Sequence, residues 1–191
     1  MLYLCCVIFR KIQNCENRLL SKIRVFYYYH ISKHNFIINN NVIFSKGFCI
    51  ESDISLTKIL INAHCRFRAH CNIVMGQGGK LTIGENCFFN NNCSVNCFSE
   101  IYIGNNNQFG EGVKMYDHNH NFREKSKLIN EQGYSLGKIK IGDNCWFGSN
   151  VVILKGVEIG NNVVIGAGCI IYKSIPSDIV IVNNQSLEVR P

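Results

Sequence analysis

The chain has 191 residues, of which 47% are hydrophobic and 17% charged, and it contains only two prolines. This composition excludes a disordered or collagen-like protein and is typical of one globular domain. The formal net charge is +7, and the first 50 residues hold seven Lys or Arg against one acidic residue, so the excess charge belongs to the N-terminal segment. No recognition motif accompanies this charge, so we expect no nucleic-acid partner.

Residues 1–35 are predicted to form a basic, helical N-terminal segment. Apolar residues recur there with the spacing of one or two amphipathic helices, at Ile12, Leu19, Leu20, Ile23 and Phe26. The apolar run 2–9 is too short to span a bilayer, and it lacks the flanking residues of a signal peptide. We therefore expect a cytoplasmic protein, whose basic segment either contacts the inner face of the membrane or is a solvated helical face.

From about residue 36 the chain follows a six-residue period. Between 141 and 171 every sixth residue is aliphatic or aromatic: Ile141, Phe147, Ile153, Ile159, Ile165 and Ile171. The same period opens again at Ile61, Ile83 and Ile103. Six is neither a helical nor a strand period, and it indicates a short strand and a turn repeated three times per coil. The pattern predicts an all-β, parallel solenoid over 36–182, followed by a tail over 183–191.

Cysteine usage fits the same repeat. The chain has eleven cysteines, an odd number, and no CxxC pair, so we expect neither a disulfide framework nor a zinc site. Six of them occupy the fifth position of a hexad: Cys65, Cys71, Cys87, Cys93, Cys145 and Cys169. A small apolar side chain is expected at this position, and the cysteines are predicted to fill the core.

The period breaks once, between Met115 and Ile141. These residues are 26 positions apart where the repeat predicts six, so residues 116–140 are expected to leave the solenoid as an excursion. The excursion opens with "MYDHNHNF", which places Asp117, His118 and His120 within four positions. Long excursions from a rigid scaffold often carry function.

The hexads, the histidine-bearing excursion and "IGDNCWFGSNVVILKGVEIGNNVVIGAGCIIYKSIP" together resemble the hexapeptide-repeat acyltransferases over residues 60–182. The nearest branch is the maltose and galactoside acetyltransferases, with the surface-polysaccharide O-acetyltransferases akin to them. This resemblance implies a left-handed parallel β-helix and a homotrimer with active sites between subunits. It also implies direct acetyl transfer from acetyl-CoA to a sugar or polysaccharide acceptor, without a metal.

The resemblance also implies the site residues. The catalytic histidine of the family falls on His120, and His118, two residues earlier, remains the alternative. A neutral imidazole has a pKa near ambient pH and can take the proton of an attacking hydroxyl. Asp117 either holds the tautomer of this imidazole or makes the turn. Phe88 and Asn90 match positions that contact the acceptor, and Asn90 could also be a turn residue.

The acetyl-CoA site is expected farther along the chain. The residues implied for it are Trp146, Ser149, Ala167, Tyr172, Lys173 and Arg190. A backbone N–H near Ser149 is the candidate for stabilising the oxyanion. Trp146 could instead pack at a subunit interface. The end of the chain departs from the family pattern, since Asn183 and Gln185 stand where Gly and Pro are usual.

The predicted function is therefore O-acetylation of a sugar hydroxyl in a surface polysaccharide, such as a capsule or O-antigen, or in its precursor. N-acetylation of an amino-sugar nucleotide remains an alternative, because the fold serves both reactions. Two other classes are open. One is a zinc-dependent carbonic anhydrase that would use His64, His70 and the excursion histidines, and the other is a non-catalytic scaffold.

Overall fold

The six-residue period folds as three stacked parallel sheets that together form a solenoid. In the computed structural model, the described residues are 19–23, 35–52 and 56–184. Residues 19–23 are helical, and the rest of the predicted helical segment 1–35 lies outside the described residues apart from Asn35. No helix in these ranges is both long enough and apolar enough to cross a membrane.

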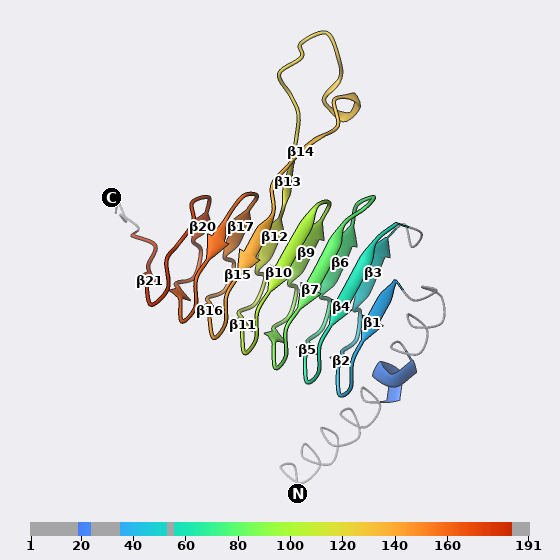
Figure 1. The fold of residues 1–191 in the computed structure, drawn as a ribbon, viewed down its shortest axis with the longest axis vertical. Helices are drawn as coiled ribbons and strands as arrows, with labels where there is room; N and C mark the ends of the chain where they lie inside the picture. The colour runs from blue at the N-terminus through green and yellow to red at the C-terminus, as the bar shows by residue number, and fades with distance from the viewer. Residues whose placement is uncertain (1–18, 24–34, 53–55, 185–191) are drawn as a thin grey trace, which may run out of the picture.

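Each sheet takes one strand from each coil, in register (Figure 1). The first face stacks β1 (Phe36–Ile38), β4 (Lys58–Ile61), β7 (Lys80–Ile83), β10 (Glu100–Ile103), β15 (Ile139–Ile141) and β18 (Glu158–Ile159). The second stacks β2 (Ile43–Phe44), β5 (Arg66–Phe67), β8 (Phe88–Phe89), β11 (Gln108–Phe109), β16 (Trp146–Phe147), β19 (Val164–Ile165) and β21 (Val180–Ile181). The third stacks β3 (Cys49–Ser52), β6 (Asn72–Met75), β9 (Ser94–Cys97), β12 (Lys114–Tyr116), β17 (Val152–Leu154) and β20 (Ile170–Ile171). The predicted parallel solenoid is confirmed, and the architecture is consistent with a left-handed β-helix.

The core is a set of columns built from the same hexad position in successive coils. Phenylalanines from five coils form one column, Phe44, Phe67, Phe89, Phe109 and Phe147. The last four stack ring on ring with centroids 4.5 to 4.8 Å apart, and Phe44 is tilted against Phe67 at 5.3 Å. All six cysteines predicted to fill the core are buried. Identical side chains can stack because coils repeat at the strand spacing of about 4.8 Å.

The corners between faces use residues in the left-handed backbone region. Six such residues have φ between 55° and 62° at one corner of successive coils: Asn41, His64, Asn86, Asn106, Asn144 and Asn162. Asparagine tolerates this conformation better than other residues that have a Cβ atom, which accounts for its abundance. His64 and His70 are exposed turn residues of this kind. In the described ranges, no three His, Cys, Asp or Glu side chains are grouped so that they could hold a metal ion.

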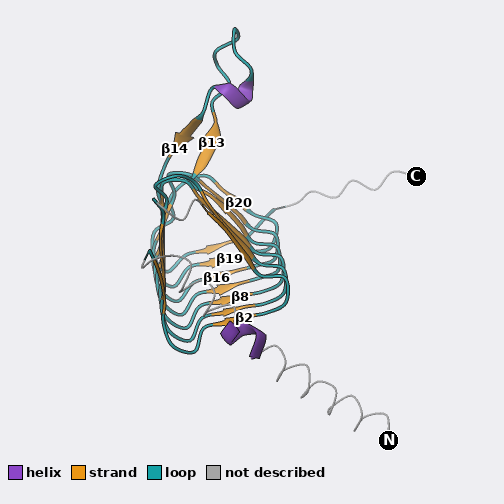
Figure 2. Ribbon diagram, turned by 90° about the vertical axis from the view of Figure 1, so that its right-hand side faces the viewer, coloured by secondary structure: helices purple, strands orange, loops and turns teal. Residues whose placement is uncertain are grey.

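The excursion leaves the solenoid as a β-hairpin. Strands β13 (His118–His120) and β14 (Tyr134–Leu136) pair antiparallel, and the loop between them contains the 3₁₀ helix η1 (Ile129–Glu131). Because β12 ends at Tyr116 and β15 begins at Ile139, the excursion covers 117–138, slightly less than the 116–140 expected. Viewed along the stack, the hairpin extends from one corner of the three-sided solenoid (Figure 2).

Candidate active site

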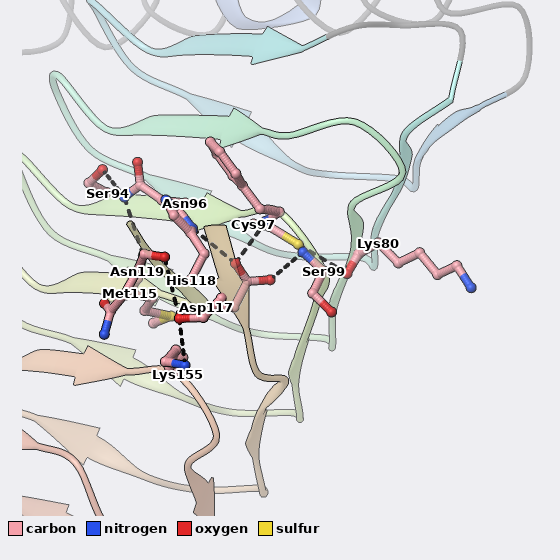
Figure 3. Close-up of polar contacts among 12 residues, drawn as sticks. Lys80, Ser94, Asn96, Cys97, Ser99, Met115, Asp117, His118, Asn119 and Lys155 are labelled. Atoms are coloured by element: carbon pink, nitrogen blue, oxygen red, sulfur yellow. Dashed lines mark hydrogen bonds and ion pairs between the residues drawn. The ribbon is translucent and has the colours of Figure 1, made fainter. Parts of the chain in front are cut away.

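Asp117 fixes the base of the hairpin to the neighbouring coil. Its side chain is fully buried, and its two carboxylate oxygens accept hydrogen bonds from the backbone N–H groups of Phe98 at 2.8 Å and Ser99 at 2.7 Å. Its backbone carbonyl accepts a hydrogen bond from the N–H of Gly137, at the return end of the hairpin, at 2.8 Å. Asp117 therefore joins both ends of the excursion to the turn after β9. Figure 3 shows the contact of its carboxylate with Ser99.

His118 lies in an aromatic cage next to this carboxylate. Its Nδ1 atom is 3.2 Å from Oδ1 of Asp117, and its side chain is only 12% exposed. The imidazole stacks on Phe98 with ring centroids 3.7 Å apart, and the edge-on ring of Tyr134 lies 5.3 Å away. The histidine whose side chain contacts the Asp117 carboxylate is therefore His118.

His120 occupies the next position on the same face of β13. It is exposed, and it lies opposite Tyr134 in the hairpin, with the two ring centroids 4.6 Å apart. Both histidines therefore contact Tyr134, but only His120 is open to solvent. Tyr134 and Phe98 were not singled out from the sequence, because the pairing that brings them to the histidines depends on how the excursion folds back.

A pocket of about 600 Å³ opens beside His120. Its lining includes Phe122, Arg123 and Gln132 from the excursion, together with Lys155 from the solenoid. The Nζ atom of Lys155 donates a hydrogen bond to Oγ of Ser135 at 2.9 Å, and this hydroxyl is 3.4 Å from the carbonyl oxygen of Asn119. Lys155 was also missed in the sequence, since nothing in the hexad "ILKGVE" indicates that the hairpin returns over it.

The residues expected to contact the acceptor lie on the solenoid. Phe88 is half-buried on β8, and the Oδ1 atom of Asn90 accepts hydrogen bonds from Arg68 at 3.2 Å and from the backbone N–H of Asn91 at 2.9 Å. Asn90 therefore has the hydrogen bonding of a turn residue. Neither residue lines the pocket beside His120 in the described chain.

The residues expected to bind acetyl-CoA also lie away from this pocket. Trp146 faces outward on β16 and is 51% exposed, as its register predicts. Ser149 and Ala167 are exposed at equivalent corners of successive coils, where the N–H of Gly168 donates to the carbonyl of Ser149 at 2.9 Å. Tyr172 is 67% exposed, and the Nζ atom of Lys173 is 5.7 Å from the centre of its ring. Arg190 lies outside the described residues.

Comparison with known proteins agrees with this architecture. Residues 138–173 match the family model described as bacterial transferase hexapeptide (six repeats). The galactoside O-acetyltransferase of Escherichia coli K12 is 36% identical over 108 residues, which make up 56% of this chain and 52% of that enzyme. The chain thus spans about half the length of the curated relatives it matches.

Solved structures share the fold over more of the chain. The maltose O-acetyltransferase of Clostridium difficile 630 is 27% identical, with a TM-score of 0.54, and the match covers 88% of this chain and 82% of that one. AntD, an N-acyltransferase from Bacillus cereus in complex with dTDP and 3-hydroxybutyryl-CoA, has a TM-score of 0.65 over 81% of this chain and 82% of its own, but at 19% identity it shows the fold alone. The chain is thus a solenoid protein that carries the bacterial transferase hexapeptide repeat and is similar in sequence to the galactoside and maltose O-acetyltransferases.

Proposed function

We propose that this protein is an acetyl-CoA-dependent O-acetyltransferase acting on a sugar hydroxyl of a surface polysaccharide or its precursor. One observation carries the proposal: an exposed histidine, His120, projects on a hairpin from the solenoid and lines a pocket of about 600 Å³. The similarity to galactoside and maltose O-acetyltransferases supports the choice of reaction and acceptor.

In the proposed reaction His120 acts as general base. Its neutral imidazole takes the proton of the sugar hydroxyl as the oxygen attacks the thioester carbon, so that a C–O bond forms. A backbone N–H near Ser149 stabilises the resulting oxyanion. The C–S bond then breaks, and His120 returns the proton to the departing thiolate, giving the acetyl ester and free CoA. General-base assistance of this kind contributes about 10²- to 10⁴-fold in rate.

We further propose that the site is completed between subunits of a homotrimer. Among the described residues of one chain, the pocket beside His120 contains none of those assigned to acetyl-CoA: Trp146, Ser149, Ala167, Tyr172 and Lys173. A neighbouring subunit that presents these residues to the hairpin would bring base and thioester together. We place the reaction in the cytoplasm, where the basic N-terminal segment can contact an anionic membrane surface.

The assignment is tested in the native cell by NMR of its surface glycan, before and after mild base. His120→Ala is expected to remove base-labile acetyl groups, whereas His70→Asn, which removes an exposed imidazole from a solenoid corner, leaves them in place. Loss of base-stable acetyl would indicate N-acetylation instead. An unchanged glycan in a His120→Ala strain with folded protein would overturn His120 as the base, and the same result with His118→Ala would overturn the polysaccharide assignment.

A further inference from the structure

Lys155 places a cation at the pocket without a carboxylate to neutralise it. Its side chain is half-buried, and its ammonium group donates to the neutral hydroxyl of Ser135. Among the described residues, the ion pairs join Asp117 to His118, Glu124 to Lys127, and Glu100 to Lys138, so Lys155 takes part in none of them. A partly desolvated ammonium with only a neutral partner is stabilised by an anion that enters beside it.

The charges around Lys155 do not cancel. Arg123 also lines the pocket, and its guanidinium forms no ion pair within the described part of the chain. The acidic residue of the lining, Glu124, is already engaged, because its Oε2 atom is 2.9 Å from Nζ of Lys127 and its Oε1 atom accepts from Oγ of Ser126 at 3.2 Å. The described lining therefore carries two cations and one carboxylate, and neither cation is ion-paired with that carboxylate.

The rest of the lining suits a sugar ring. Phe122 is 66% exposed, so its aromatic face is available for packing against a ring. The side-chain amide of Gln132 is engaged within the loop, since its Oε1 atom accepts from the N–H of Glu124 at 3.0 Å and its Nε2 atom donates to the carbonyl of Glu124 at 2.9 Å. The volume of about 600 Å³ falls within the range of about 300–1,000 Å³ that is common for small-molecule sites. The pocket is thus large enough for one sugar residue together with a charged substituent.

We propose that the acceptor is an acidic sugar, and that Lys155 and Arg123 bind its anionic group while a hydroxyl of the same ring is presented to His120. The anionic group is either a ring carboxylate or a phosphate of an activated sugar. A guanidinium can pair with either in bidentate fashion, and the ammonium adds a point charge. This inference rests on the proposed function and narrows its acceptor class.

The same two cations should make the enzyme discriminate between anionic and neutral acceptors. A neutral sugar of the same shape leaves Lys155 and Arg123 unpaired in the occupied pocket, and a site built for a polar partner rejects an analogue that lacks it. We expect an anionic sugar to be preferred over its neutral counterpart by about tenfold or more in kcat/KM, and we expect the preference to shrink as ionic strength rises.

The test uses the purified full-length chain with acetyl-CoA and sugars of gluco, galacto and manno configuration. Each sugar is supplied in three forms: the neutral methyl glycoside, the methyl glycoside of the corresponding uronic acid with its carboxylate free, and the nucleoside diphosphate sugar. The informative variant is Lys155→Gln, which removes the charge and keeps a donor for Ser135. The control is Lys138→Gln, which removes an exposed lysine at the end of the excursion, outside the pocket.

Lys155→Gln is expected to raise KM for the anionic acceptor by about tenfold, leaving KM for acetyl-CoA and the neutral sugars unchanged, while Lys138→Gln changes none of them. A preference for uronates identifies the carboxylate, and a preference for nucleotide sugars identifies the phosphate. Equal rates for charged and neutral acceptors, unaffected by Lys155→Gln, would overturn the acidic acceptor and leave O-acetylation standing.

A binding measurement distinguishes failure of the inference about the acidic acceptor from failure of the proposed O-acetylation. NMR titration of the wild-type protein with each anionic sugar, without acetyl-CoA, is expected to shift the ring resonances of His120, and Lys155→Gln should weaken that binding. If no anionic sugar shifts these resonances, the inference is overturned, whatever the transfer assay shows. Binding that depends on Lys155, without transfer to any sugar, would support the inference about the pocket and count against the proposed O-acetylation.

Discussion

At the scale of single residues, Asp117 has the most demanding environment at the site. Its buried carboxylate accepts two backbone hydrogen bonds and faces His118. Asp117→Asn replaces one accepting oxygen by an NH₂ group, which would then point at a backbone N–H. A buried donor left without an acceptor costs about 1–3 kcal/mol. We expect the free energy of unfolding to fall by about this amount, as measured by urea denaturation.

The matched control for Asp117 is Glu100, whose carboxylate also ties the excursion to the solenoid. Its Oε2 atom is 2.9 Å from Nζ of Lys138, but both side chains are exposed. Surface ion pairs contribute roughly 0–1 kcal/mol, so Glu100→Gln should change stability little. If the two variants were equally stable, Asp117 would not be the anchor of the hairpin.

Single residues also show where prediction from the sequence stops. The position of His120 on an excursion could be predicted, because the hexad period fixes where the solenoid is interrupted. The contacts of His118 with Phe98 and Tyr134 could not, since they depend on a stacking register and on a hairpin pairing that leave no periodic signal. For the same reason, the sequence suggested that Asp117 contacts a catalytic imidazole but could not show that the histidine it contacts is His118.

At the scale of elements, the coils approach so closely that some corner positions exclude a side chain. A Cβ atom on Gly142 would lie 2.7 Å from the carbonyl of Gly160 and would overlap the side chain of Asn161 in the next coil. Neither coil can move away without disturbing its own sheets. Overpacking of this kind costs about 1–3 kcal/mol, so Gly142→Ala should lower the free energy of unfolding by that amount.

Gly166 provides the comparison within the same fold. A Cβ atom there would meet its nearest neighbour, the carbonyl oxygen of Ile181, at 3.3 Å, which small adjustments near the end of the stack can relieve. Gly166→Ala should therefore destabilise the protein less than Gly142→Ala in the same denaturation experiment. Equal losses would mean that the contact between coils is not what sets the cost, since the effect of alanine on the unfolded chain is stabilising.

At the scale of the whole molecule, the architecture was more predictable than the site. Each hexad repeats the same inward residue, so periodicity alone determines which side chains form the phenylalanine and cysteine columns. The pocket beside His120 joins the excursion to Lys155, which belongs to a different coil. No local pattern encodes a contact of that type.

The buried Cys97 thiol makes the stability of the molecule sensitive to alkaline pH. Burial raises the pKa of the Cys97 thiol above its ordinary value of 9.0, and the negative charge of Asp117 raises it further. Below that value the thiol is protonated in both the folded and the unfolded chain. Above it the unfolded chain releases the proton while the folded chain retains it, so the free energy of unfolding falls as pH rises.

Each such thiol contributes about 1.4 kcal/mol of lost stability per pH unit in this range. Between about pH 9 and about pH 10.5, the free energy of unfolding of the wild type should therefore fall more steeply with pH than that of Cys97→Ala. The two slopes should differ by up to about 1.4 kcal/mol per pH unit. Other titrating groups are common to both proteins and cancel in the comparison. Denaturant titrations at several pH values measure the slopes, and identical slopes for wild type and Cys97→Ala would show that the Cys97 thiol ionises as readily in the folded chain as in the unfolded one.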